Sequence, residues 1–164
     1  MTFAARPASP DDAPILTQIY NEGIEDRVGT FETRPRQVQD VAAWFDGIHP
    51  IIVVEANGEV IAFASTSSYR SRECYSGIAE FSVYVARKAR GQGAGTVAMR
   101  ALLDAVKPAG IWKLVSRIFV ENHASRRLMA SMGFREVGIY EKHARLDGQW
   151  RDVVIVERLI PDNL

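Results

Sequence analysis

The residues best suited to chemistry lie where a strand-like segment, residues 78–85, runs into the alternating glycines of residues 90–95. Residues 96–107 follow with apolar spacing that predicts a helix. A strand that passes through glycines into a helix directs several backbone N–H groups into one concavity, where they and the helix dipole favour an anion. Glycine leaves room for phosphate oxygens and permits positive φ. The segment therefore predicts a phosphate-binding loop, with Arg90 adding a charge-assisted contact at its mouth.

Other interpretations of these glycines differ in how well they fit the sequence. An ordinary strand-to-helix turn remains open, because alternating glycines also arise there. A P-loop requires Gly-Lys-Ser/Thr at its end, which residues 90–96 lack. The dinucleotide fingerprint requires a different glycine spacing near the first strand of a βαβ unit. A pyrophosphate-bearing ligand of another type fits best.

A carboxylate stands just before this loop. Strict alternation along the strand places Glu80, Ser82 and Tyr84 on one face and the intervening residues on the other. Glu80 could act there as a general base, directly or through a water molecule. A solvated glutamate on the polar face of a strand is the competing interpretation, and Tyr84 is interpreted first as an aromatic residue that packs on a neighbour.

Composition limits the class of protein. The 164 residues are 47% hydrophobic and 24% charged, which is typical of one folded domain spanning residues 1–164. Lys plus Arg and Asp plus Glu both number 20, so nothing favours nucleic acid as a partner. One cysteine, Cys74, excludes an internal disulfide, and neither it nor the three histidines have metal-ligand spacing. We expect no metal, no membrane span and a cytoplasmic location.

The elements that must position these residues follow from periodicity and turn signals. Asn57-Gly58 and Asp147-Gly148 each predict a two-residue hairpin turn between strands. The expected order is β-α-α-β-β-β-α-β-α-β-β, an α/β arrangement around a central mixed sheet. Strands are predicted at residues 3–6, 51–55, 60–67, 78–85, 112–120, 134–146 and 150–159, and helices at residues 13–26, 38–45, 96–107 and 123–131.

Two motifs in this order resemble a known family. Residues 81–85, four intervening residues, residues 90–95 and then a helix are similar to the acetyl-CoA-binding core of the GCN5-related N-acetyltransferases, the GNAT family. Residues 120–128 followed by residues 132–134 resemble the second cofactor segment of that family. The resemblance spans nearly the whole chain and implies the GNAT fold, with a central mixed sheet flanked by helices.

The resemblance implies transfer of an acetyl group from acetyl-CoA to an amine, with Glu80 as the general base. It also implies that a backbone N–H of the strand, which we assign to Val85, stabilises the developing oxyanion. Many relatives carry a tyrosine in the helix at residues 123–131 as the acid for the thiolate; this chain has Met129 and no tyrosine there, so the acid is unassigned. The cofactor-binding residues implied are Val83, Tyr84, Val85, Arg90, Gly91, Gln92, Gly93, Ala94, Gly95, Thr96, Asn122 and Ser125.

A narrower resemblance is to the branch that includes the phosphinothricin, methionine sulfoximine and arsinothricin acetyltransferases. Its marks are residues 19–21, residues 30–32, Arg72 with Tyr75, Glu80 and residues 148–153. It implies a small amino-acid-like acceptor, a glutamate analogue with a tetrahedral γ-substituent. A histidine of some members falls on Asp147, so that contact is lost. The implied substrate-binding residues are Thr30, Phe31, Glu32, Arg70, Arg72 and Tyr75.

Several alternatives remain open. The acceptor could be a protein N-terminus or a polyamine, although Arg70 and Arg72 disfavour a polycation. The chain could also bind acyl-CoA as a regulatory module without turnover. A hydrolase based on Cys74 is the weakest alternative, because no histidine is evidently positioned beside it. The branch resemblance implies a homodimer, for which the terminal hairpin with Trp150 is a candidate interface. His49, His123 and His143 are interpreted as surface or capping residues.

Overall fold

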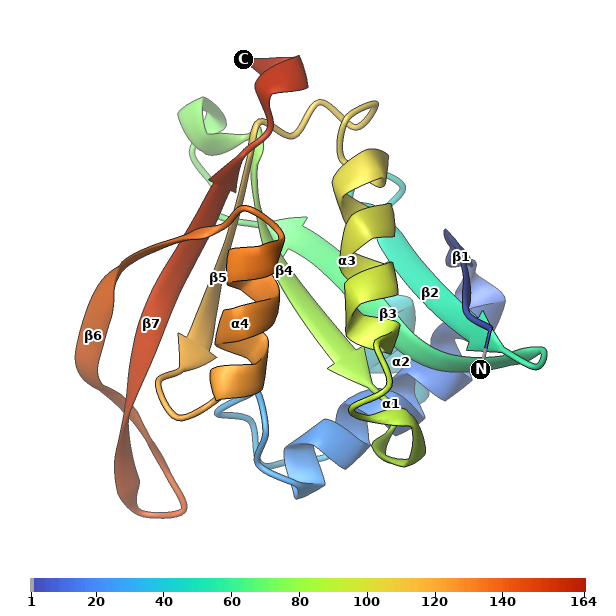
Figure 1. The fold of residues 1–164 in the computed structure, drawn as a ribbon, viewed down its shortest axis with the longest axis horizontal. Coiled ribbons are helices and arrows are strands. Elements are labelled where there is room, and N and C mark those ends of the chain that lie inside the picture. The colour runs from blue at the N-terminus through green and yellow to red at the C-terminus, as the bar shows by residue number, and fades with distance from the viewer. Residues whose placement is uncertain (1) are drawn as a thin grey trace.

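The computed structural model describes residues 2–164, and this part of the chain contains one seven-stranded mixed sheet in the order β1-β2-β3-β4-β5-β7-β6 (Figure 1). The predicted order of elements and the GNAT-type α/β fold class are confirmed. The strands are β1 (Ala4–Pro7), β2 (Ile51–Ala56), β3 (Glu59–Ser68), β4 (Ile78–Val85), β5 (Lys113–Phe119), β6 (Arg135–Leu146) and β7 (Gln149–Leu159), and the helices are α1 (Ala13–Glu25), α2 (Val38–Ala42), α3 (Ala94–Ala105) and α4 (His123–Ser131).

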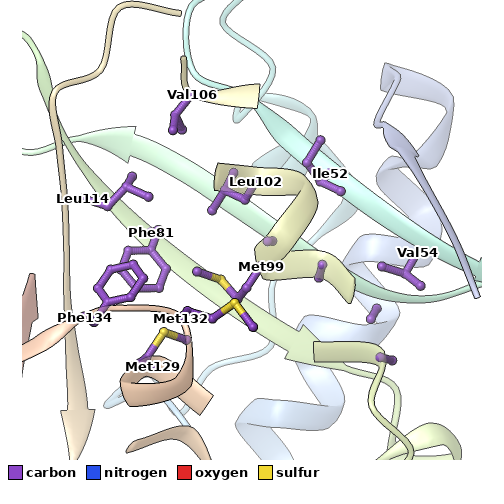
Figure 2. Packing of buried hydrophobic residues seen from close by; sticks show 14 of the residues in the cluster. Ile52, Val54, Phe81, Met99, Leu102, Val106, Leu114, Met129, Met132 and Phe134 are labelled. Carbon is purple, nitrogen blue, oxygen red and sulfur yellow. The ribbon is translucent and has the colours of Figure 1, made fainter. Parts of the chain in front are cut away.

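Helices cover both faces of the sheet. Figure 1 shows α3 and α4 in front of it, with α1 and α2 behind. On the front face, three methionines, Met99, Met129 and Met132, fill the space between the two helices and the sheet (Figure 2). Their unbranched thioethers suit the irregular gap between a helix pair and a twisted sheet. This core holds α3 over β2, β3 and β4, and it joins α4 to the same face of the sheet.

An aromatic cluster forms much of the core on the opposite face. The Tyr84 ring stacks on Phe63 at a centroid distance of 5.6 Å and meets the edge of Tyr20 at 5.0 Å. Trp44 completes the cluster against Tyr20 at 5.4 Å. Such pairs add stabilisation beyond the area they bury. They fix α1 and α2 on the face of the sheet that carries Tyr84.

The central feature of the sheet is the divergence of two parallel neighbours. β4 and β5 pair only from Ile78–Lys113 to Glu80–Val115, and beyond these pairs the strands separate (Figure 1). Ser116 Oγ still donates to the carbonyl of Phe81 at 2.8 Å, just where the gap opens. The divergence leaves one side of β4 without a partner strand along its last residues.

The register of β3 and β4 decides which peptide groups of β4 face this gap. Ala86 N donates to Ile61 O at 2.7 Å, so Ala86 and every second residue before it bond to β3. In an antiparallel ladder the intervening residues direct their N–H and C=O groups the other way. Val83 and Val85 therefore present their peptide groups to the gap beside β5.

Three of the helices, α1, α2 and α3, differ from the prediction by one to three residues at a boundary. α2 ends at Ala42, because residues 43–45 continue in tighter turns in which Trp44 N and Phe45 N bond three residues back. α3 begins at Ala94, two residues earlier than predicted, since Gly93 adopts a φ of 92° as its N-cap. The glycine loop and the helix N-terminus are therefore one continuous structure.

Candidate active site

A cleft of about 430 Å³ opens in the gap between β4 and β5. The ends of both strands, the glycine loop, the first turns of α3 and α4, and residues 28–29 form its walls. The cleft brings together most of the cofactor-binding residues predicted from the sequence, although the individual contacts remain predictions. Those that line it are Val83, Tyr84, Val85, Arg90, Gly91, Gly93, Gly95, Thr96, Asn122 and Ser125.

The glycine loop has the backbone geometry of an anion site. Gly91 and Gly93 adopt φ of 77° and 92°, which favours glycine over other residues. Gly95 is restricted by space instead, since a Cβ there would lie 3.3 Å from the Leu128 side chain on α4. Gln92 is exposed and Ala94 is buried, and neither side chain lines the cleft. The loop can therefore bring the backbone of Gly91 and Gly93 close to a phosphate at the N-terminus of α3.

Arg90 has a protein partner. Its Nη1 lies 2.7 Å from Asp26 at the end of α1, and the same carboxylate accepts hydrogen bonds from Arg87 at 2.8 and 3.0 Å. Hydrogen bonds from Arg87 and Arg90 lower the pKa of Asp26 to about 2. Arg90 thus attaches the glycine loop to α1, and its contact with a phosphate remains a prediction.

Asn122 connects α4 with the wall of the cleft. Its Oδ1 accepts a hydrogen bond from Ser125 N at 3.2 Å, so Asn122 is the N-cap of α4. Its Nδ2 donates to the Val28 carbonyl at 3.0 Å. The side chain therefore fixes residues 28–29 against the start of α4, and the predicted contact with the cofactor stays a prediction.

A second cavity, of about 620 Å³, lies beside the cleft on the sheet face that carries Glu80. The two share the lining residues Gly29, Phe81, Ser82, Ser116, Arg117 and Phe119, so they meet where β4 and β5 separate. Of the predicted substrate residues, Thr30, Phe31, Arg70 and Tyr75 line this cavity. Arg72 and Glu32 stand outside its lining, where Arg72 precedes a short 3-10 turn and Glu32 pairs with Arg36 at 3.0 Å.

Glu80 lies in this second cavity, and 34% of its side chain is exposed. Arg117 Nη2 donates to its Oε1 at 3.3 Å. Tyr84, two residues beyond Ser82 on the same face, is buried in the aromatic cluster and its hydroxyl donates to Gly29 O at 3.4 Å. Burial raises the pKa of the Tyr84 phenol, which keeps it protonated.

Sequence reasoning missed several residues that line the second cavity. Arg117, Lys113 and Glu157 lie on the floor of the cavity, on β5 and β7. His143, interpreted from the sequence as a surface or capping residue, is exposed and also lines it, with its ring 5.0 Å from Tyr140. Alternation along β5 could have indicated Arg117. Nothing local indicated His143, because a register shift between Tyr140 and Ala144 sets its direction.

Two further observations concern metals and membranes. Among the residues that the structure describes, no three histidine, cysteine, aspartate or glutamate side chains gather into a group that could hold a metal ion. No helix within residues 2–164 combines the length and the apolar character needed to cross a membrane.

Comparison with known proteins agrees with this geometry. Residues 16–134 match the model of the Acetyltransferase (GNAT) family. The phosphinothricin N-acetyltransferase of Streptomyces coelicolor is 32% identical, over 93% of this chain and 94% of the relative. The L-methionine sulfoximine/L-methionine sulfone acetyltransferase of Pseudomonas paraeruginosa is 30% identical, over 96% and 94%. A phosphinothricin acetyltransferase from Sinorhizobium meliloti, solved in complex with AcCoA, superposes with a TM-score of 0.90 at 28% identity, covering 97% of this chain and 89% of that one.

The divergent strands, the glycine loop at a helix N-terminus and the adjoining cavity define an acyltransferase site. The chain belongs to the GNAT acetyltransferase family. It is an N-acetyltransferase that uses acetyl-CoA as donor, and its relatives include the phosphinothricin-type branch.

Proposed function

We propose that this enzyme acetylates the α-amino group of a small amino-acid substrate, a glutamate analogue with a tetrahedral γ-substituent such as phosphinothricin, methionine sulfoximine or arsinothricin. The observation that carries the proposal is the position of Glu80 in a cavity that shares a wall with the cofactor cleft. An amine bound in this cavity would lie between a carboxylate and the place where the acetyl group arrives. The activities of the two relatives named above support the substrate class.

The fit of the cleft to acetyl-CoA follows from its backbone. Gly91, Gly93 and the N-terminus of α3 would hold the diphosphate, and the peptide groups of Val83 and Val85 would bond the extended arm as a neighbouring strand would. When bound, the cosubstrate supplies an activated acetyl group. The deeper end of the cleft, lined by Phe81 and Ser82, would then receive the thioester.

The proposed reaction is a direct transfer. An α-ammonium group is mostly protonated below about pH 8, so it must lose a proton before it can attack. Glu80 accepts that proton, directly or through a water molecule. The amine nitrogen forms a bond to the acetyl carbon while the bond from carbon to sulfur breaks. From the sequence we assigned the stabilisation of charge on the carbonyl oxygen to the Val85 N–H. The thioester, however, would lie near Phe81 and Ser82. We therefore propose that the Val83 N–H, the nearer of the two that face the gap, stabilises this charge and that Val85 contacts the extended arm.

The protonation of the departing thiolate has no assigned donor. Met129 lines the cleft at the helix that carries a tyrosine in many relatives, and a thioether has no proton to give. Tyr84 is directed to Gly29 and is buried. We therefore propose that solvent or a residue of the cavity wall protonates the thiolate.

A thiol-release screen tests the proposal. Purified protein with acetyl-CoA is offered phosphinothricin, methionine sulfoximine, methionine sulfone, arsinothricin, ordinary amino acids, polyamines and peptides. We expect release of free thiol with the glutamate analogues and with methionine sulfone. Release only with peptides or polyamines would transfer the assignment to those acceptors. Binding of acetyl-CoA without release by any amine would indicate the regulatory module instead.

We also propose that the enzyme is a homodimer. The outer strand β6 is exposed along most of its length and presents Val137, Ile139 and Tyr140, and Trp150 of β7 is exposed further along the hairpin, where it pairs with Arg145. A long, exposed, apolar edge strand is a liability that proteins cover. Light scattering should report twice the mass of one chain, and the chain mass alone would contradict the proposal.

A further inference from the structure

One ion pair lies where the second cavity, which we propose holds the acceptor amine and call the acceptor cavity, meets the cofactor cleft. Glu80 of β4 pairs with Val115 at the last rung of the β4–β5 ladder, and Arg117, two residues further along β5, reaches it with Nη2 3.3 Å from Glu80 Oε1. Both line the acceptor cavity, and Arg117 lines the cleft as well. Their side chains are 42% and 34% exposed, so both remain accessible from the cavity.

The guanidinium of Arg117 has unused capacity. It carries five N–H donors, and within residues 2–164 the structure gives it one side-chain acceptor, a single oxygen of Glu80. This is an end-on contact, so the bidentate geometry that arginine offers a carboxylate is unused. A second carboxylate entering the cavity could therefore bind Arg117 without first breaking a stronger interaction.

An α-amino acid matches this arrangement. It carries its ammonium group and its carboxylate on the same carbon, so its two charges lie as close together as those of the Arg117–Glu80 pair. We propose that this pair recognises the zwitterionic head group: Arg117 binds the α-carboxylate, and the amine then lies against Glu80. The inference rests on the proposed function, in which Glu80 receives the proton of the amine.

The other cations of the cavity are less suitable for this task. Arg70 stacks on the ring of Tyr69, with its guanidinium carbon 4.5 Å from the centroid. Lys113 pairs with Glu157 at 3.2 Å, and Arg135 binds the same carboxylate at 2.8 Å. Arg117 is the cavity cation that the structure places in contact with Glu80. It can therefore orient a carboxylate so that the adjacent amine is next to the base.

This arrangement makes Arg117 a specificity-determining residue. An amine without a carboxylate leaves Arg117 paired with Glu80, whose oxygen then stays occupied. An α-amino acid gives the guanidinium a second partner and turns the Glu80 oxygens towards the amine. The enzyme should therefore prefer an α-amino acid over the otherwise identical decarboxylated amine.

The test compares methionine sulfone with its decarboxylated amine as acceptors for the wild type, Arg117→Gln and Arg117→Lys. Charged hydrogen bonds of this kind correspond to about 10- to 100-fold in affinity, so Arg117→Gln should raise KM for methionine sulfone by that factor. The KM for acetyl-CoA and the kcat/KM for the decarboxylated amine should not worsen. The KM of Arg117→Lys for methionine sulfone should lie between those of the wild type and Arg117→Gln, because lysine keeps the positive charge but cannot form the bidentate contact of a guanidinium.

Controls distinguish recognition from damage to the fold. Arg100→Gln, at an exposed position on α3, removes an arginine away from both cavities and should behave as the wild type. Equal losses of Arg117→Gln with both acceptors, or an unchanged KM for methionine sulfone, would overturn the proposal.

Calorimetric titration with methionine sulfone separates this inference from the proposed function. Binding that is weakened by Arg117→Gln supports recognition even if the wild type releases no thiol, and only the proposed function would then fail. Failure of the wild type to bind methionine sulfone or any other α-amino acid of the screen would overturn the recognition itself.

Discussion

Replacing Gly77 with alanine should destabilise the sheet where β4 and β5 begin, next to the candidate active site. Gly77 immediately precedes β4, and its carbonyl accepts a hydrogen bond from Trp112 N at 2.8 Å. A Cβ built on Gly77 would lie 1.9 Å from Cε3 and 2.1 Å from Cζ3 of the Trp112 ring. An indole is rigid and cannot bend away as a flexible chain end would, so the ring or the start of β4 must move.

Overpacking of this kind costs about 1–3 kcal/mol. For a chain of this size, each kcal/mol changes Tm by roughly 2–4 °C, so Gly77→Ala should lower Tm by about 2–12 °C. Thermal unfolding followed by circular dichroism measures the change. Gly138→Ala is the matched control, because the φ of Gly138, like that of Gly77, is not positive, and a Cβ on Gly138 would meet no atom within 4 Å.

A double-mutant cycle tests the cause. If the clash with the indole is responsible, Gly77→Ala should cost less in a Trp112→Leu background, where the side chain is smaller and flexible. Equal Tm changes for Gly77→Ala and Gly138→Ala, or the same cost of Gly77→Ala in both backgrounds, would refute the reasoning.

Three further predictions concern the site. Glu80→Gln should lower turnover at neutral pH by about 10²- to 10⁴-fold while acetyl-CoA binding by calorimetry hardly changes; equal turnover in both proteins would exclude Glu80 from the mechanism. Gly95→Val should weaken acetyl-CoA binding about 10-fold or more, since a Cβ 3.3 Å from Leu128 pushes α3 and α4 apart, and unchanged affinity would disprove the close approach. The pKa of Asp26 is lowered from 3.8 to about 2, so its ion pairs stabilise the fold above pH 3.8 and are lost as the pH falls through about 2. The Tm deficit of Asp26→Asn should therefore shrink over that range, and a constant deficit would contradict the assignment.

The parts of this molecule that sequence predicts well are those encoded within a few residues. Asn57-Gly58 indicates a turn with two positive φ angles, and the structure gives 53° and 76°. The glycine loop is equally local, because its positive φ values and the helix that follows come from adjacent residues. The side of β4 that carries Glu80 follows from strand alternation alone.

The remaining features depend on contacts between distant segments. Arg90 binds Asp26 across 64 residues, and no local pattern predicts that the end of α1 lies beside the loop. Arg117 meets Glu80 only because β4 pairs in parallel with β5 and the ladder stops there. His143 depends on the bulge between Tyr140 and Ala144, where Lys142 adopts a φ of 47°. Such placements are set by packing of the whole sheet.

The gap between β4 and β5 also affects how this enzyme can evolve. The donors that we propose for the cosubstrate are peptide groups of Val83 and Val85, and an ordinary substitution does not remove a peptide group. The acceptor cavity is instead formed largely by side chains such as Phe31, Arg70 and Tyr75. Mutation of these side chains can therefore change which amine the cavity accepts while the backbone contacts proposed for acetyl-CoA persist.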